Sequence, residues 1–278
     1  MDRITISDVR KTFQLHSGQS IVVEGKPTDR VPVLAGVDLT IRRGEFVTLV
    51  GPSGSGKSVL LDIIGGLTQA TSGRTWIDRT LVTQPDAKVG YVFQQYALFP
   101  WRNALENVEY ALEVRGVPRL ERRERARHFL TLFGLKGFED RYPSQLSGGM
   151  QQRVAIARAL STDPEVLLMD EPFAALDAQT RDLLQSELLR IWEQINTTVV
   201  FVTHAIDEAI YLADRVVVMT ARPGLVKEIV EIDLPRPRDL DLRNSPEFNH
   251  YRQQVWEALR DEVTRAQQDW ALSASYAN

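Results

Sequence analysis

The sequence contains no cysteine and no long hydrophobic run, and each absence excludes a class of protein. Without a thiol the chain forms no disulfide and no thiolate metal site, which is typical of proteins in a reducing compartment such as the cytosol. No apolar stretch approaches the ~20 residues that a membrane-spanning helix needs. The opening residues, Met1-Asp-Arg-Ile-Thr-Ile, lack the basic flank and apolar core of a signal peptide. If the protein works at a membrane, we expect it to work through a partner.

Positive charge is also scarce. The 33 Lys and Arg residues are outnumbered by 37 Asp and Glu residues, which gives a net charge of −4 and a pI near 5.7. Proteins that bind nucleic acid usually carry a basic surface, so we expect no nucleic-acid partner. The 278 residues, 43% of them hydrophobic and 25% charged, are enough for one large globular domain or two small ones.

A glycine-rich stretch is the most informative feature of the chain. It consists of Gly51, Pro52, Ser53, Gly54, Ser55, Gly56, Lys57 and Ser58. An apolar run at 46–50 precedes it and another at 59–64 follows, which predicts a strand, a phosphate-binding loop and a helix. Glycines let the backbone turn its N–H groups toward an anion, and the following helix adds its positive N-terminus. We expect Lys57 to reach the β- and γ-phosphates and Ser58 to bind Mg²⁺. The alternative is a flexible Gly/Ser loop that happens to carry a lysine.

The remaining pattern predicts an α/β fold. Strand-like segments at 4–9 and 33–41 precede the phosphate loop, and 74–77 and 89–93 follow it. Later apolar strands at 166–169, 199–203 and 215–219, with a helix expected over 178–194, predict a parallel sheet covered on both faces. Between them, residues 103–160 have helical periodicity and predict an inserted helical subdomain.

Two further segments stand apart from this core. Residues 14–32 contain Gly18, Gly25, Pro27 and Pro32 and read as a long surface excursion. After a strand expected at 229–234, Ser245-Pro246-Glu247 has the pattern of an N-cap followed by proline at the first helical position. We therefore expect one terminal helix that packs on the core and then frays. The predicted domains are residues 1–236, with the helical subdomain at about 95–162, and an extension at 237–278.

Two carboxylates end one of the predicted strands. Asp170 and Glu171 follow the apolar run 166–169, and ligands of parallel sheets bind beyond the carboxyl ends of the strands. Because adjacent strand residues point in opposite directions, the two should differ in role. Asp170 suits the Mg²⁺ shell, and Glu171 suits orienting or deprotonating an attacking water. The alternative is a solvated strand end with two surface acids.

Ser147, Gly148 and Gly149 open a predicted helix and offer a second set of bare backbone donors. By itself such a turn is equally typical of a simple helix cap. The phosphate loop, Gln94, the 146–149 segment, Asp170-Glu171, Ala175-Leu-Asp177 and Thr203-His204 nevertheless occur in the order and approximate spacing of the ATP-binding cassette (ABC) ATPases, which the chain resembles from residue 1 to about 220.

This resemblance implies a P-loop ABC-type ATPase with a RecA-like core, an N-terminal antiparallel β part and an inserted α-helical subdomain. It implies a homodimer that sandwiches two ATP molecules, in which Ser147–Gly149 of one subunit face the γ-phosphate held by the other. Gln94 would contact Mg²⁺ and water, Asp177 would cross the dimer interface, and His204 would contact the γ-phosphate. Phe13 would stack on adenine, although the long 14–32 segment leaves a core-packing role open.

Several features resemble one branch of the family, the ATPases of bacterial importers for nitrate, taurine and aliphatic sulfonates. They are Met150, Phe99-Pro-Trp101, Arg222-Pro-Gly224 and Pro235-Arg-Pro-Arg-Asp239. This resemblance implies two transmembrane permease subunits, a substrate-binding protein and a peripheral position on the cytoplasmic face of the inner membrane. Residues 96–101 either dock a permease helix or pack inside the helical subdomain. The alternative functions are an exporter or lipid-trafficking ATPase, a non-transport ABC protein, or a degenerate nucleotide-binding module.

Overall fold

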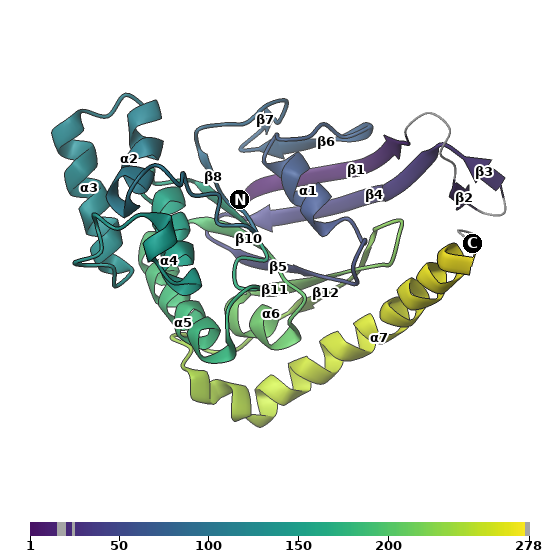
Figure 1. Ribbon diagram of the computed structural model, residues 1–278. Coiled ribbons are helices and arrows are strands. Elements are labelled where there is room, and N and C mark those ends of the chain that lie inside the picture. The colour runs from purple at the N-terminus through teal and green to yellow at the C-terminus, as the bar shows by residue number, and fades with distance from the viewer. Residues whose placement is uncertain (16–20, 24–25, 276–278) are drawn as a thin grey trace. The chain divides into compact units, whose positions relative to one another are not determined.

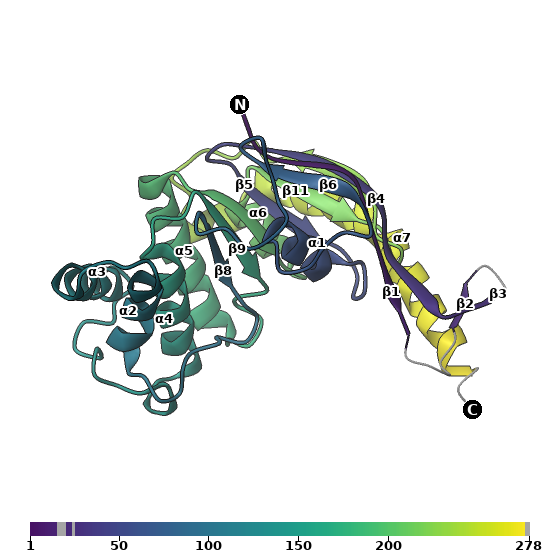
Figure 2. The same cartoon turned by 90° about the horizontal axis from the view of Figure 1, so that it is seen from above.

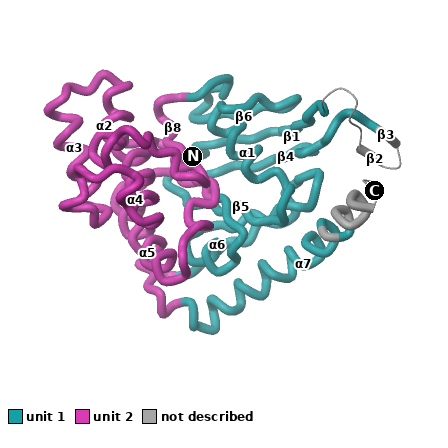
Figure 3. Tube along the Cα trace, in the orientation of Figure 1, with its two compact units in different colours: residues 1–85, 202–234, 243–278 teal, residues 86–201, 235–242 magenta. Residues whose placement is uncertain are grey.

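The computed structural model of the protein describes residues 1–15, 21–23 and 26–275 (Figure 1). The chain divides into two compact units (Figure 3). Unit 1 comprises residues 1–85, 202–234 and 243–278, and unit 2 comprises residues 86–201 and 235–242. Our domain boundary at residue 236 follows the family resemblance rather than this division, and it stays a prediction.

The N-terminal part of unit 1 is an antiparallel sheet. Its strands are β1 (Asp2–Gln14), β4 (Arg30–Arg42), β6 (Ser72–Ile77) and β7 (Thr80–Leu81), in the order β4-β1-β6-β7. The two long strands β1 and β4 run side by side in Figure 2, with Ile4 opposite Ile41 and Phe13 opposite Val31. Ile4 and Ile6 are buried with Thr5 half-buried between them, which is the alternation that a half-buried strand requires, and a register shift between Ile6 and Val9 returns Val9 to the buried face.

The predicted surface excursion at 14–32 is shorter than expected and contains two short strands. β1 continues to Gln14 and β4 begins at Arg30, and within the segment β2 (Ile21–Val23) pairs antiparallel with β3 (Lys26–Thr28). Pro32 lies inside β4 opposite Thr12. The glycines and prolines indicated loop, but pairing with a distant strand overrides such local signals. Residues 16–20 and 24–25 lie outside the described part of the chain.

The second part of unit 1 carries the phosphate loop. The parallel strands β5 (Phe46–Val50) and β11 (Arg215–Met219) are joined by the antiparallel β12 (Val226–Glu231), in the order β12-β11-β5. All five residues of β5 are buried, as a parallel strand covered on both faces requires. The helices α1 (Lys57–Ile64) and α6 (Ile206–Leu212) follow β5 and precede β11 in the chain. β12 begins and ends three residues earlier than the predicted 229–234 strand.

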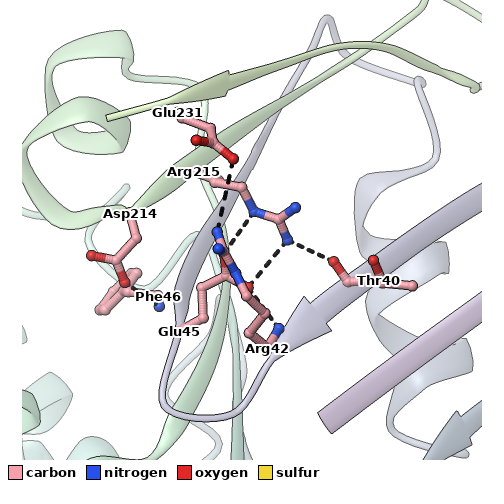
Figure 4. Close-up of polar contacts among 7 residues, drawn as sticks. All are labelled: Thr40, Arg42, Glu45, Phe46, Asp214, Arg215 and Glu231. Carbon is pink, nitrogen blue, oxygen red and sulfur yellow. Dashed lines mark hydrogen bonds and ion pairs between the residues drawn. The ribbon is translucent and has the colours of Figure 1, made fainter. Parts of the chain in front are cut away.

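A buried carboxylate joins β4, β5 and β11 (Figure 4). Glu45, 5% exposed, accepts hydrogen bonds from Arg215 Nε at 2.6 Å and from Arg42 Nη2 at 3.0 Å. Arg215 also donates to the Thr40 carbonyl at 2.6 Å, and the Phe46 N–H donates to Asp214 at 2.9 Å. A buried charge is tolerated only when it is paired and hydrogen-bonded, so these contacts fix the start of β5.

Unit 2 contains β8 (Val89–Val92), β9 (Val166–Asp170) and most of β10 (Thr198–Val202), adjacent in that order, with β8 parallel to β9. The expected helical subdomain consists of α2 (Ala104–Val114), α3 (Arg119–Leu132) and α4 (Gly148–Leu160), which pack on one another. A short 3-10 helix at Pro143–Gln145 precedes α4, and α5 (Ala178–Ile195) follows β9. Asn103 and Glu106 form a reciprocal capping box that starts α2.

The C-terminal helix is α7 (Pro246–Ser275), preceded by a 3-10 turn at Leu240–Asn244. Ser245 caps it as predicted, because its hydroxyl accepts a hydrogen bond from the Phe248 N–H at 3.1 Å. Phe248, Val255 and Leu259 are buried against the unit 1 elements α6, β11 and β12. The predicted fraying falls on residues 276–278, which lie outside the described residues. Over the described residues, no helix combines the length and apolar character that crossing a membrane requires.

Candidate nucleotide-binding site

The phosphate loop leaves β5 and ends at the N-terminus of α1. Gly56 is the N-cap residue, with φ +86°, and a Cβ there would lie 2.7 Å from Leu34 Cδ2. Glycine is therefore required both by the left-handed backbone and by the packing on β4. The arrangement confirms the predicted order of strand, loop and helix, the setting in which backbone N–H groups bind phosphate.

Lys57 is buried, only 5% exposed, in the first turn of α1. Its ammonium donates to the Gly51 carbonyl at 2.9 Å, to the Pro52 carbonyl at 3.0 Å and to the Ser55 hydroxyl at 3.3 Å. These contacts hold a positive charge inside the curl of the loop. A desolvated cation beside bare backbone donors is a strong site for phosphate.

His204 is exposed and lies two residues after the end of β10 at Val202. The turn that carries it is fixed from inside: the Thr203 hydroxyl donates to the buried Glu208 carboxylate and accepts from the Ala205 N–H at 3.0 Å. Thr203 and Glu208 are positioning residues; Thr203 was named only as part of a sequence motif, and Glu208 was not singled out. The available signal was the position of Glu208, an acidic residue directly before the apolar run 209–213.

Phe13 lies on β1 and is 42% exposed. The Lys11 ammonium is 4.8 Å from its ring centroid and donates to the Gln69 carbonyl at 2.7 Å. The ring is thus not part of the hydrophobic core, and the backbone at Phe13 remains in β1, opposite Val31 of β4. Adenine stacking by Phe13 stays a prediction.

Gln94 and Glu171 meet in unit 2. The Gln94 side-chain amide donates to Glu171 Oε2 at 3.3 Å. Glu171 follows β9 with φ +44°, a left-handed conformation that is costly for a residue with a Cβ and is often found at functional sites. Asp170, the last residue of β9, is half-buried. The different roles of these two carboxylates stay a prediction.

Ser147 caps α4, and its hydroxyl accepts a hydrogen bond from the Met150 N–H at 3.3 Å. Gly148 and Gly149 form the first turn of this 13-residue helix. The Tyr96 hydroxyl lies over Gly148, because a Cβ on that glycine would be 2.9 Å from it. The helix terminus therefore presents backbone donors next to an aromatic hydroxyl from the segment after Gln94.

The segment 96–101 is packed on the helical subdomain at one end and exposed at the other. Arg158 of α4 donates to the carbonyls of Ala97 at 2.7 Å and Tyr96 at 3.1 Å, and burial lowers the pKa of Arg158. The Phe99 ring packs edge-on against the ring of Tyr110 in α2, with the ring centroids 4.6 Å apart. Trp101, in contrast, is 71% exposed. Phe99 thus belongs to the subdomain, whereas Trp101 is presented on the surface.

Asp177 is the N-cap of α5 and accepts a hydrogen bond from the Thr180 N–H at 3.0 Å. This bond lowers the pKa of the Asp177 carboxyl, so the residue is anionic at neutral pH. The capping role is structural, and its predicted place at a dimer interface is not tested by it.

The described residues contain no group of three or more His, Asp or Glu side chains arranged for a metal ion. A transition-metal site is therefore not found in this part of the chain. Mg²⁺ differs because it needs few protein ligands, prefers oxygen and completes its shell with nucleotide phosphates and water. The exposed Ser58 hydroxyl and the half-buried Asp170 carboxylate supply donors of this kind.

A phosphate loop with a buried lysine, placed between a parallel strand and a helix, defines the class of P-loop nucleotide-binding α/β proteins. Residues 34–174 match the family model described as ABC transporter. The chain belongs to the ABC transporter ATP-binding family and is an ABC ATPase subunit.

Curated relatives extend the match beyond this region. The chain is 57% identical to an uncharacterized ABC transporter ATP-binding protein of Methanocaldococcus jannaschii, over 86% of this chain and 88% of that protein. It is 45% identical to the aliphatic sulfonates import ATP-binding protein SsuB of Bacillus cereus, over 91% of this chain and 94% of that protein.

Solved structures confirm the fold class. A dimeric post-hydrolysis state of an ATP-binding cassette bound to ADP and Pi is 36% identical, with a TM-score of 0.71, and covers 84% of this chain and all of that one. A dimeric bacterial ABC transporter cassette gives a TM-score of 0.72 at 37% identity over the same shares.

Proposed function

We propose that this ATPase subunit energises the import of a small anion, with aliphatic sulfonates as the first candidates and nitrate or taurine as the others. The observation that carries the proposal is the 45% identity to the aliphatic sulfonates import protein over nearly the whole of both chains. An exporter or lipid-trafficking role, or a non-transport role, is less well supported, because the relatives with an assigned solute are named as import proteins.

The proposed chemistry uses the residues of the candidate site. Backbone donors of 51–58 and the Lys57 ammonium hold the phosphates of ATP. Glu171, oriented by the Gln94 amide, takes the proton from an attacking water, and His204 contacts the γ-phosphate. Ser58, Gln94 and Asp170 would hold Mg²⁺, which neutralises charge developing on the phosphates. That these residues act on one nucleotide is inferred from the motif order.

We further propose a homodimer in which Ser147–Gly149 and Asp177 of one subunit act on the nucleotide of the other. The similarity to two dimeric cassette structures supports this assembly. Two permease subunits, docked in part through Trp101, and a substrate-binding protein would complete the system. The subunit would then lie on the cytoplasmic face of the membrane.

The test is reconstitution of the subunit with its permease and binding protein in liposomes. We expect ATP hydrolysis to rise several-fold when the binding protein carries an alkanesulfonate, with smaller responses to taurine and nitrate. Substrate-free binding protein is the matched control. Hydrolysis that does not respond to any of the three anions, or export of solute from the liposome side that holds ATP, would contradict the proposal.

A further inference from the structure

The turn between β11 and β12 (residues 220–225, here called the 220–225 turn) is tightly structured. Thr220 holds both ends: its N–H donates to the Leu225 carbonyl at 3.0 Å, and its hydroxyl donates to the Pro223 carbonyl at 2.9 Å. The same hydroxyl accepts from the Leu225 N–H at 2.9 Å. These three hydrogen bonds fix the backbone geometry of the turn.

This turn is packed directly on the phosphate loop. A Cβ on Gly224 would overlap the carbonyl oxygen of Ser55, so only glycine allows so close an approach. Gly224 is also bridged to β4, since its N–H donates to the Val33 carbonyl at 2.8 Å and its carbonyl accepts from the Ala35 N–H at 3.1 Å. The turn and the phosphate loop thus share one rigid setting within unit 1.

Helix α7 supports the turn from another direction. Glu262, 2% exposed, accepts a hydrogen bond from the Ala221 N–H at 3.0 Å and pairs with Lys227 at 2.9 Å. Because Ala221 is thereby held in place, the side chain of the next residue, Arg222, starts from a fixed point beside the loop.

Arg222 is an exposed cation that lies against Gly54 of the phosphate loop. A Cβ on Gly54 would be 3.4 Å from Arg222 Nη2 and 4.0 Å from both Cζ and Nε. In the described part of the chain, no carboxylate pairs with Arg222 and no hydrogen bond satisfies its guanidinium. Other arginines of unit 1, such as Arg42, Arg215 and Arg252, each pair with an acid.

We propose that Arg222 is a further nucleotide-binding residue, which supplies a positive charge to the phosphates held by residues 51–58. A guanidinium without an acidic partner has no neighbouring carboxylate to offset its field or compete for its donors, and its five donors suit phosphate oxygens. The rigid turn lowers the entropic cost of holding it there. The geometry assigns the contribution to phosphate binding rather than to adenine recognition or proton transfer.

The experiment measures nucleotide affinity of the full chain by calorimetry, with ADP in EDTA as the probe, and follows adenosine by thermal shift. We expect Arg222→Ala and Arg222→Gln to weaken ADP binding about tenfold, and Arg222→Lys, which keeps the charge, to stay within about threefold. Adenosine binding should not change. In hydrolysis assays KM should rise in proportion while kcat stays near the wild-type value.

Arg260→Ala is the matched control, because Arg260 is an exposed arginine on α7 that pairs with its neighbour Asp261 at 3.7 Å. It should bind ADP as the wild type does. Wild-type ADP affinity in Arg222→Ala would overturn the proposal. So would equal affinity in the Gln and Lys variants, which would assign the residue a packing role. The measurement involves no permease or solute, so its result is independent of the importer proposal.

Discussion

At the residue scale, Glu171 is the position where local strain and chemistry coincide. Its left-handed backbone, φ +44°, turns the side chain away from the direction it would take in a continued strand. The Gln94 amide then fixes one carboxylate oxygen. A general base needs an oriented carboxylate oxygen, and the Gln94 contact would orient one for the role proposed for Glu171. Strain at a single residue is tolerable when the surrounding sheet is buried, as Val166–Met169 are.

We therefore predict that Glu171→Gln lowers the rate of ATP hydrolysis by at least about 100-fold, because the amide cannot accept a proton. Nucleotide affinity should stay near the wild-type value, since no phosphate contact is lost. Phosphate release and calorimetry measure the two quantities. Glu165→Gln is the control, because that glutamate precedes the same strand and pairs with the surface Lys88. Wild-type hydrolysis in the Glu171 variant would remove this residue from the mechanism.

At the element scale, local patterns predicted the buried elements well. The apolar runs at 46–50 and 166–169 became β5 and β9, and the cap at Ser245 began α7 within one residue of its expected start. Continuous burial leaves a strong local signature, so these elements could be identified from composition and periodicity alone.

Contacts between distant segments could not be predicted in this way. The extension of β1 and β4 through 10–14 and 30–32 depends on cross-strand pairing that no local pattern records. The packing of Gly224 on Ser55 joins residues 169 positions apart. In the sequence, Arg222-Pro-Gly224 was only a marker of a family branch. Its position beside the phosphate loop emerged from the fold.

Glu262 is the contact through which α7 holds the 220–225 turn, and it should make stability depend on pH. Burial alone would raise the pKa of Glu262, but the Ala221 N–H and the Lys227 ammonium outweigh it, so the pKa lies below its ordinary value of 4.5. A carboxyl with a lowered native pKa stabilises the fold above the unfolded-state value and loses this contribution as pH falls through the native one.

We predict that Glu262→Gln lowers the free energy of unfolding by about 1.5–3 kcal/mol at pH 7, the range for hydrogen bonds to charged groups. The deficit should shrink as the pH falls below about 4.5, because the wild-type carboxyl then becomes neutral too. Urea unfolding of both proteins at several pH values measures this difference in the free energy of unfolding. Glu257→Gln, on the same helix but hydrogen-bonded only to Gln253, is the control. A deficit independent of pH would assign the loss to packing rather than charge.

At the scale of the whole molecule, the predicted site residues fall into two groups. Unit 1 carries Phe13, the phosphate loop and His204, while unit 2 carries Gln94, the Ser147–Gly149 turn, Asp170, Glu171 and Asp177. The chain has two sets of backbone donors suited to phosphate, one in the phosphate loop and one at the start of α4. A single subunit needs only the first set to hold its nucleotide. The second set would therefore be available to bind the nucleotide held by another subunit.

We predict that Glu171→Gln with saturating Mg·ATP is a dimer and that the same variant with ADP is a monomer, as measured by light scattering on a sizing column. In this variant ATP is bound but not hydrolysed, so the γ-phosphate stays available to the start of α4 in the partner subunit. Because ATP would then bind the dimer more tightly than the monomer, it shifts the equilibrium toward the dimer. Adding Ser147→Arg should abolish the dimer, because a long side chain would fill the turn. Ser144→Arg is the control, since Ser144 is exposed three residues earlier. A monomer in saturating Mg·ATP, or a dimer that survives Ser147→Arg, would contradict a shared site at this turn.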